Sequence, residues 1–459
     1  MTGLLLRHCR LENTAAVDVR IRDGRVMEIG RPLDHLGEEV LNGRGGELLP
    51  GLHDHHLHLH AMAAGLASVD VGPTSVRSRA ALVERLRAAA ADGPVRAVGY
   101  HESVAGELDR AALDEAAADV PIRLQHRSGR GWFLNTAALR ALGLEDADDP
   151  AIERDAAGRA TGRIWRGDRL LRDPDGPLPS LAAVGRLLAR YGVTGVTDAT
   201  PDLAPRTAAA LRSAHATGAL PQRLLLLGAA LGDAGPDVGP YKIVLDEETG
   251  LDLDAVIEQV RECHAASRPV AFHAVTAAET VVAVTALRTS GGQPGDRLEH
   301  GSVLPPELDR ELARLGVVVV TQPTFVADRG DDYLRDVEVR DRPHLYRCRS
   351  LLDAAIGVAA GSDAPYGDPD PWRAIASATT RRTRGGSVLG AHETLPARRA
   401  LELFLGSAGD PGGPPRQVTT GALADLCLLD APLDDVLREP SAEHVVATVV
   451  AGRVAYSAG

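Results

Sequence analysis

Eight short runs rich in Val, Ile and Leu recur along the middle of this chain and alternate with longer, alanine-rich segments. The longer segments have helical periodicity, as at 253–267 and 306–316. This alternation is typical of parallel βα units, and eight units are the number that closes a barrel. The sequence therefore predicts an α/β fold with a (β/α)8 TIM-type barrel. Its expected strands lie at 48–56, 192–200, 223–229, 241–246, 268–274, 296–302, 316–323 and 357–365.

The two ends of the chain differ from this middle. Short apolar runs with period-two alternation occupy 4–48 and 424–456, and the Asp23-Gly24 pair is typical of a β-hairpin. Two strand-rich ends around a long middle predict one small composite β domain built from both termini. The predicted domains are this β domain (1–48 plus 395–459), the barrel (49–65 plus 183–394) and an insertion after the first barrel strand (66–182).

The insertion has no strong pattern of its own, and we expect it to form a substrate-facing subdomain. Two strand-like runs, VRAVGY at 95–100 and PIRLQH at 121–126, leave an alternative open. In that alternative they belong to the barrel itself, and the insertion is smaller.

The formal net charge of −13 disfavours binding to a phosphate backbone, so nucleic acid is not expected as a partner. The four cysteines are far apart and form no CxxC pair, which favours isolated thiols in a reducing cytoplasm. No apolar stretch approaches the length of a membrane span, and the N-terminus lacks a signal-like apolar region. We expect a cytoplasmic protein that acts on a small molecule and not at a membrane. Whether it forms a homo-oligomer stays open.

Residues 53–60 read HDHHLHLH and contain five of the sixteen histidines. Alternate residues of a strand share a face, so His56 with His58, or His58 with His60, can point at one ion. Neutral imidazole is a good zinc ligand. The alternative is an exposed polar run, which the leucines alternating with the histidines argue against. The spacing therefore predicts a metal site here.

Lysine and arginine total 50, and Lys242, within the apolar run YKIVL, is the only lysine. A bias toward arginine explains the other 49 but not this exception. A neutral lysine amine can take up CO2 to form a carbamate that binds metals as a carboxylate would, and arginine cannot because its pKa is too high. The alternative is that this single lysine remains by chance on a barrel rim. We interpret Lys242 as a metal ligand.

Three further candidate ligands end predicted strands. His273 closes RPVAFHA, His300 closes DRLEH, and Asp363 follows the apolar run of AAGSDAP. Barrel active sites form at the C-terminal ends of the strands. An aspartate there can bind metal and take the proton of an activated water. Taken singly, each residue is more often a core, rim or turn residue than a ligand, but together they predict one metal centre.

Other residues are weaker candidates. Asp54 is expected to be an outer partner of a ligand imidazole. His126 in the insertion, and Arg329 and Trp372 after the seventh and eighth predicted strands, are expected to contact substrate.

The order HxH, Lys, His, His, Asp resembles the amidohydrolase superfamily. The segment LLPGLHDHHLHL (48–59) is similar to that superfamily's Pro-Gly-x-x-Asp-x-His-x-His start, which selects His56 and His58 as the pair. Other segments resemble, more narrowly, amidohydrolase family 3, the YtcJ-like metal-dependent hydrolases. These are LNTAALRALGL, ARYGVTGVTDA, RLEHGS, AAGSDAP and, in the C-terminal β domain, TGALADLCLLD; the resemblance runs from about residue 20 to 456.

The resemblance implies a (β/α)8 barrel with a composite β domain, and one or two divalent metal ions, zinc being expected. It also implies that Lys242 is carboxylated and bridges two ions, and that Asp363 is both ligand and base. The substrate-facing parts depart from the family: Arg130 stands where histidine is common, and the segments after Lys242 and His273 lack the usual Asp-Gly and Gly-Asp features. No member's substrate is therefore carried over. The complete ligand set is His56, His58, Lys242, His273, His300 and Asp363.

The predicted activity is metal-dependent hydrolysis of an amide-like C–N bond of a small molecule. Asp363 is expected to pass a proton from water to the leaving nitrogen, and His300 to help hold the oxyanion. Alternatives are a deaminase, a metal-dependent decarboxylase and a non-catalytic metal-binding protein. The presence of Asp363 argues against the last, because a scaffold needs no base.

Overall fold

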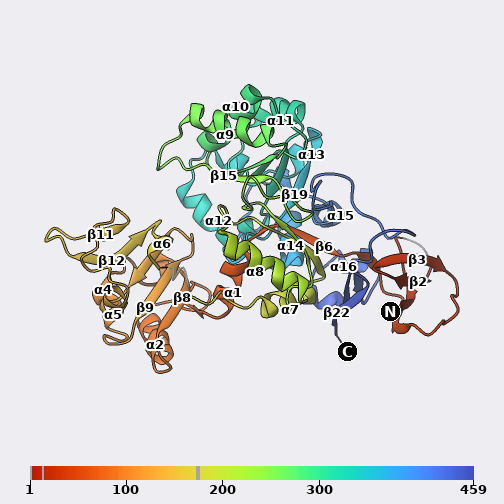
Figure 1. The fold of residues 1–459 in the computed structure, drawn as a ribbon, viewed down its shortest axis with the longest axis horizontal. Coiled ribbons are helices and arrows are strands. Elements are labelled where there is room, and N and C mark those ends of the chain that lie inside the picture. The colour runs from red at the N-terminus through yellow and green to blue at the C-terminus, as the bar shows by residue number, and fades with distance from the viewer. Residues whose placement is uncertain (1–2, 13–14, 172–175, 459) are drawn as a thin grey trace. The chain divides into compact units, whose positions relative to one another are not determined.

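The computed structural model describes residues 3–12, 15–171 and 176–458. They form two units, shown as a ribbon in Figure 1. One unit is His60–Pro179. The other combines the chain before and after it, Met1–Leu59 and Ser180–Gly459.

The larger unit contains eight parallel strands in two sheets. A three-stranded sheet has the order β14-β13-β6, and a five-stranded sheet runs from β15 to β19 in chain order. Each strand overlaps one of the eight predicted runs. Their bounds are β6 (Leu52–Leu57), β13 (Val193–Asp198), β14 (Arg223–Leu226), β15 (Tyr241–Val244), β16 (Val270–Ala274), β17 (Arg297–His300), β18 (Val318–Thr321) and β19 (Val358–Ala360).

Backbone hydrogen bonds join the two sheets at both edges. The N–H of Lys242 donates to the carbonyl of Leu227 at 3.0 Å, and the N–H of Asp363 donates to the carbonyl of His56 at 2.7 Å. The ends of β6 and β19 are thereby held side by side, although some 300 residues separate them in the sequence.

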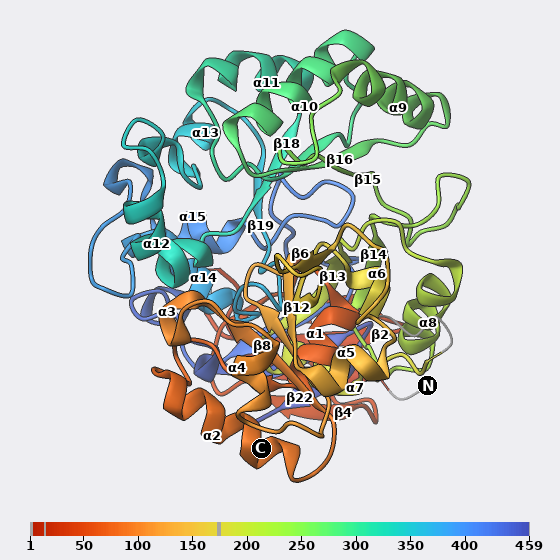
Figure 2. The same cartoon turned by 90° about the vertical axis from the view of Figure 1, so that its left-hand side faces the viewer.

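Helices follow most of these strands. In Figure 2, α9, α10 and α11 lie along the outer side of β15, β16 and β18. The start of α10 has a capping box, in which Thr276 and Glu279 satisfy each other's backbone N–H groups. The helices of this unit are α7 (Ala182–Arg190), α8 (Pro205–Ala216), α9 (Leu253–Ala265), α10 (Ala277–Ser290), α11 (Asp309–Leu315), α12 (Thr324–Asp336), α13 (Arg349–Asp353), α14 (Pro371–Thr380), α15 (Ala397–Glu402) and α16 (Leu433–Val436).

Two four-stranded sheets carry the strand-rich ends of the chain, with orders β3-β2-β1-β4 and β22-β21-β20-β5. They share one core, in which Leu6 and Val19 of the first sheet pack in one cluster with Leu428 and Val449 of the second. The predicted hairpin at Asp23-Gly24 joins β2 to β3, and both residues have positive φ. The strands are β1 (Leu4–Cys9), β2 (Val17–Arg22), β3 (Arg25–Gly30), β4 (Glu39–Asn42), β5 (Leu48–Pro50), β20 (Leu426–Leu429), β21 (Val445–Val450) and β22 (Arg453–Ser457).

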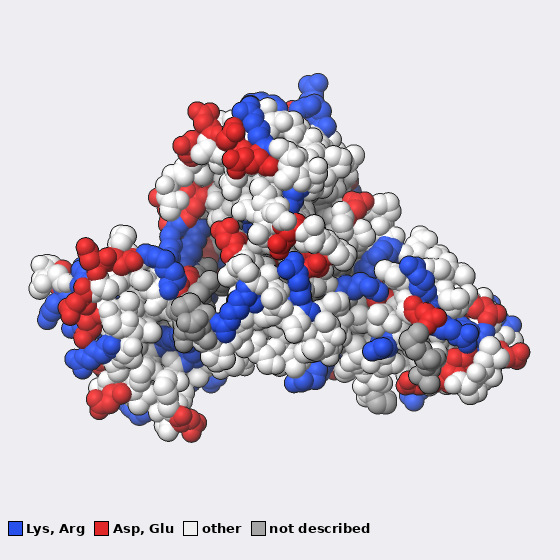
Figure 3. Space-filling model, viewed as in Figure 1, with Lys and Arg blue, Asp and Glu red and all other residues white. Residues whose placement is uncertain are grey.

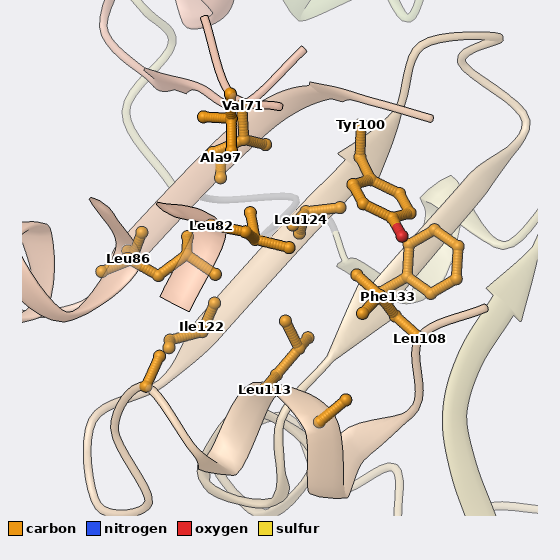
Figure 4. Packing of buried hydrophobic residues seen from close by; sticks show 14 of the residues in the cluster. Val71, Leu82, Leu86, Ala97, Tyr100, Leu108, Leu113, Ile122, Leu124 and Phe133 are labelled. Atoms are coloured by element: carbon orange, nitrogen blue, oxygen red, sulfur yellow. The ribbon is translucent and has the colours of Figure 1, made fainter. Parts of the chain in front are cut away.

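The smaller unit has its own six-stranded sheet, ordered β11-β12-β10-β9-β8-β7. Figure 4 shows its core, where Leu82 and Leu86 from α2 face Ile122 and Leu124 from β9. The runs VRAVGY and PIRLQH form β8 and β9 of this sheet, so the alternative that put them in the barrel is wrong. The elements are α1 (Leu59–Leu66), which begins at the last residue of the larger unit, β7 (Val69–Asp70), α2 (Arg79–Ala90), β8 (Val95–Tyr100), α3 (Glu102–Ala105), α4 (Arg110–Asp114), β9 (Ile122–His126), β10 (Gly131–Leu134), α5 (Thr136–Ala141), β11 (Ile152–Arg154), β12 (Ala160–Trp165) and α6 (Asp168–Leu171).

The surface carries charges of both signs. On the face shown in Figure 3, patches of basic and acidic side chains are intermixed. Among the described residues, no helix combines the length and the apolar character that crossing a membrane requires.

All four cysteines are free and buried. Burial raises the pKa of the Cys263 thiol to about 11, and the pKa values of Cys9, Cys348 and Cys427 to about 12.

Because only the thiolate reacts, these thiols are expected to react about 10²- to 10³-fold more slowly in the native protein at pH 8 than in the unfolded chain. A colorimetric thiol assay with and without guanidinium measures this ratio. Rapid reaction of any native thiol would contradict it.

Candidate metal centre

Strand β6 supplies two imidazoles that meet an aspartate from the segment after β19. His56 is fully buried within the strand, and His58 follows directly after its end. Nε2 of His58 lies 3.1 Å from Oδ1 of Asp363, and Nε2 of His56 lies 3.6 Å from the same oxygen. One ligand atom from each of the three residues lies within 4.8 Å of the others, so the three can hold one ion. His60, the other candidate partner of His58, lies in helix α1.

Two further imidazoles extend this group. His273 belongs to β16, and His300 is the last residue of β17, its neighbour in the sheet. The ring centroid of His300 lies 4.6 Å from that of His56 and 4.6 Å from that of His273. The four imidazoles therefore form a continuous cluster at the C-terminal ends of the parallel strands.

Lys242 comes from β15, which pairs with β16. It is only 4% exposed, and its Nζ makes no hydrogen bond with any described residue. Burial lowers the pKa of Lys242 to about 8, although Glu299 and Asp363 act in the opposite direction. The amine is thus a buried polar group without a hydrogen-bond partner, and such groups are rare in folded proteins.

The backbone is unusual at two of the predicted ligands. His300 has a φ of 73° and Asp363 a φ of 54°, in the left-handed region that residues other than glycine rarely adopt. Such conformations persist only where the surroundings enforce them, and they cluster at functional sites.

Asp54 helps to fix the backbone beside His56 and Asp363. Its carboxylate accepts hydrogen bonds from the N–H and the hydroxyl of Ser362, at 3.0 and 2.5 Å, and from the N–H of His56 at 3.1 Å. Burial raises its pKa to about 6. The prediction that Asp54 orients an imidazole is therefore wrong: it holds the backbone beside His56 and Asp363.

Three other side chains orient the imidazoles. The carboxylate of Glu299 accepts from Nδ1 of His56, Oε1 of Gln322 accepts from Nδ1 of His300 at 2.8 Å, and the Thr200 hydroxyl lies 3.1 Å from Nδ1 of His58. A partner on Nδ1 fixes the ring and directs Nε2 to a metal. None of the three stands out in the sequence, where the only local signal is that Glu299 adjoins His300 in the RLEH segment.

Charge within the cluster is arranged for cation binding. Burial lowers the pKa of His56 to about 3 and also lowers those of His273 and His300, so these rings are neutral at neutral pH. Burial alone would raise the pKa of Glu299, but the charges of the buried Arg297 and of Lys242 hold it well below its usual value. The centre thus combines neutral imidazoles with an ionised carboxylate.

The pKa of Asp363 is also below its usual value. Burial would raise it, but the close contact of Oδ1 with Nε2 of His58 and the nearby imidazoles of His300 and His56 outweigh that effect. Oδ1 of Asp363 and Nε2 of His56 make no hydrogen bond with a described residue. Buried, unsatisfied nitrogen and oxygen atoms that converge fit a divalent cation, and the donor types suit zinc.

The three residues predicted to contact substrate are not members of this ligand cluster. Arg329 on α12 stacks on Phe325, 4.1 Å from the ring centre, and donates to the carbonyl of Tyr366 at 2.6 Å. Trp372 is fully buried, and its indole N–H donates to the carbonyl of Tyr191 at 3.0 Å, which gives it a packing role. His126 lies in the smaller unit.

Tyr366 is a neighbour of the cluster that no sequence pattern indicates. Its ring is in edge contact with His58, with centroids 5.5 Å apart. Arg329 donates to the Tyr366 carbonyl and therefore helps to position Tyr366 beside His58.

Comparison with known proteins adds an independent line of evidence. The sequence model of the Amidohydrolase family matches residues 39–456. The chain is 26% identical to the N-substituted formamide deformylase of Arthrobacter pascens, over 97% of this chain and 95% of that protein. It is also 26% identical to an amidohydrolase named YtcJ from Bacillus subtilis, over 91% of this chain and 90% of the relative.

Solved structures show the same fold. An uncharacterized metal-dependent hydrolase from Pyrococcus furiosus superimposes with a TM-score of 0.72 at 19% identity, covering 93% of this chain and 99% of that one. A second, from Pyrococcus horikoshii, gives a TM-score of 0.71 at 19% identity, covering 88% of this chain and 92% of that one.

Proposed function

Because the chain belongs to the amidohydrolase family, we propose that it is a metal-dependent hydrolase that cleaves an amide-like C–N bond of a small molecule. The observation that carries the proposal is the convergence of His56, His58 and Asp363 on one point, beside a buried lysine amine without a hydrogen bond. We further propose that the eight parallel strands form one (β/α)8 barrel, that the strand-rich ends form a composite β domain, and that the smaller unit is an insertion.

In this proposal the metal is zinc, with one or two ions per chain, and its ligands are His56, His58, Lys242, His273, His300 and Asp363. Lysine is a poor ligand for zinc as an amine, whereas its carbamate offers two oxygens. The buried Nζ of Lys242, which makes no hydrogen bond, supports carboxylation by CO2. Two further polar atoms of the cluster without hydrogen bonds, Nε2 of His56 and Oδ1 of Asp363, support direct coordination.

A divalent metal at this centre supplies Lewis-acid chemistry, which makes water more acidic and polarises the acceptor carbonyl. Asp363 takes the proton of the attacking water on Oδ2, the carboxylate oxygen that is not assigned to the metal, as the new C–O bond forms. It returns that proton to the leaving nitrogen as the C–N bond breaks, so that acid and amine are released. Glu299 and Gln322 keep the rings of His56 and His300 fixed meanwhile. Nδ1 of His300 donates to Gln322 and its Nε2 is assigned to the metal, so the neutral ring has no N–H left for an oxyanion, and we assign His300 the role of ligand alone.

N-formyl amides are the first substrates to test, because one relative is named for deformylation of N-substituted formamides. Burial of the centre favours a small molecule over a polymer. The net charge of −13, and the intermixed charges of Figure 3, also argue for a small-molecule substrate rather than nucleic acid.

The test is product release by the zinc-loaded protein from a panel of N-formyl, N-acyl and cyclic amides. Release of acid and amine supports the proposal. Ammonia as the product would identify a deaminase, and CO2 released without consumption of water would identify a decarboxylase. Silence from a protein that binds zinc would refute hydrolysis of simple amides.

The orienting role of Gln322 leads to a separate prediction. Gln322→Leu removes the acceptor for Nδ1 of His300 and is expected to weaken zinc binding by about 10- to 100-fold. Zinc affinity is measured by competition with a chromogenic chelator.

The chain offers a matched control. Gln222 is also fully buried, but its amide donates to the carbonyls of Gly185 and Val193, away from the ligands. Gln222→Leu should therefore lower thermal stability and leave zinc affinity unchanged. Equal zinc affinity in both variants would show that Gln322 does not orient a ligand.

A further inference from the structure

Arg297 is a buried arginine of β17 that contacts the carboxylate of Glu299, two residues further along the same strand. Nε of Arg297 donates to Oε1 of Glu299, and Nη2 donates to Oε2 at 3.1 Å. Arg297 is only 1% exposed, and Glu299 is fully buried. Residues two apart in a strand lie on the same face, which is why these side chains meet. They form a buried bidentate pair, a geometry that fixes the plane of the carboxylate.

The same two side chains link β17 to β6, which belongs to the other parallel sheet. Nη2 of Arg297 donates to the carbonyl of His55 at 2.7 Å. The carboxylate of Glu299 accepts from Nδ1 of His56, the next residue of β6. Because the two strands lie in different sheets, these side-chain contacts, and not a backbone ladder, hold Glu299 against His56.

A stabilising role alone explains this pair poorly. Taking two charges out of water is costly, so a buried ion pair is often no more stabilising than apolar side chains of the same volume. What the pair adds is a fixed position for both oxygens of Glu299. Oε1 accepts from Arg297, and Oε2 accepts from both Arg297 and His56. The partner on Nδ1 of an imidazole decides where Nε2, the proposed ligand atom, points.

We propose that Arg297 is a positioning residue of the metal centre: it fixes the carboxylate of Glu299, which in turn fixes the ring of His56 with Nε2 directed at the ion. This inference rests on the proposed metal centre, because it concerns how firmly one of its ligands is held. The competing explanation is that Arg297 only balances the charge of Glu299 and thereby contributes to the stability of the fold.

Charge and position predict effects of opposite sign. A guanidinium near a metal centre repels a cation, so by charge alone its removal should raise zinc affinity. Arg297→Met removes the charge and the bidentate contact together. Loss of an outer partner of a ligand imidazole usually weakens metal binding. We therefore expect Arg297→Met to weaken zinc binding by about 10- to 100-fold.

Zinc affinity of the full-length chain is measured by competition with a chromogenic chelator, and thermal stability is measured on the same samples. Arg381 provides a matched control, because it is also 1% exposed. Its guanidinium donates only to backbone carbonyls, those of Leu345, Tyr346 and Leu389. Arg381→Met should lower thermal stability and leave zinc affinity unchanged. Zinc affinity in Arg297→Met that equals or exceeds that of the wild type would overturn the proposal.

Glu299→Gln tests whether Arg297 acts through this carboxylate. The amide oxygen of glutamine can still accept from Nδ1 of His56, but the charged bidentate pair is lost. In the Glu299→Gln background, Arg297→Met is therefore expected to change zinc affinity by less than about twofold, whereas independent effects would add in full. An equal loss in both backgrounds would show that Arg297 does not act through Glu299, and the proposal would fail.

Arg297→Lys covers the case in which Arg297→Met does not fold. Lysine keeps the positive charge and can donate to Glu299, but it lacks the planar fork that holds both carboxylate oxygens. A charge-balancing role predicts wild-type zinc affinity for Arg297→Lys, and a positioning role predicts a loss of about tenfold. A wild type that binds no zinc would refute the metal centre and this inference with it. Normal zinc affinity in both the wild type and Arg297→Lys would refute the inference alone.

Discussion

Asp363→Asn is expected to lower kcat for hydrolysis of an N-formyl amide by about 10²- to 10⁴-fold. An amide at this position cannot take the proton of the attacking water. The change also removes the negative charge of the Asp363 carboxylate, which the neighbouring imidazoles stabilise. Initial rates of formate release measure the effect. Metal content is measured on the same samples, because Asp363 is also a proposed ligand.

A surface aspartate provides the control. Asp353 on α13 forms an exposed ion pair with Arg349 at 3.1 Å, and exposed pairs contribute little to stability. Asp353→Asn should retain the wild-type rate. If Asp363→Asn keeps its full metal content and the wild-type rate, Asp363 is not the base and the proposed mechanism fails.

Lys242→Arg and Lys242→Ala are both expected to reduce metal affinity by more than the roughly 10- to 100-fold that loss of an outer partner costs. Arginine retains a positive charge but cannot form a carbamate, and alanine has no ligand atom. Activity should fall together with metal content. A short carboxylic acid such as propionate should partly restore Lys242→Ala, because it can enter the vacated space, but should not restore Lys242→Arg.

The composition of the chain allows a direct test of carboxylation with little ambiguity about which amine is labelled. Lys242 is the only lysine, so a carbamate signal after labelling with carbon-13 bicarbonate can otherwise come only from the α-amino group. The signal should appear in the zinc-loaded wild type and disappear in Lys242→Arg. A Lys242→Arg variant that binds metal and turns over at the wild-type rate would refute the ligand role.

The predicted strands could be found from the sequence because their signal is local. Parallel strands buried on both faces require continuous apolar runs, and each of the eight predicted runs overlaps a strand. The candidate ligands were recognised for a related reason. A buried strand that ends in histidine or aspartate places a polar group where burial is costly without a partner, so these residue types stand out against the apolar run.

Outer contacts could not be found in the same way. His56 and Glu299 are 243 residues apart, and His58 and Thr200 are 142 apart. No periodicity links such pairs, because their contact depends on how separate strands align. Asp54 illustrates the error that follows: a carboxylate between histidines suggested an imidazole partner, whereas the alignment of β6 with the chain after β19 gives it Ser362.

The sequence by itself determined which residue types stand at the strand ends, because strand and helix periodicity depend on near neighbours. Tertiary structure alone decided that β8 and β9 pair in a separate sheet, that His300 and Asp363 adopt left-handed backbone conformations, and that Trp372 is buried. The same holds for the contact between Arg297 and the carbonyl of His55. Each of these depends on contacts between segments distant in the chain, whose free energies arise only when the strands are packed together.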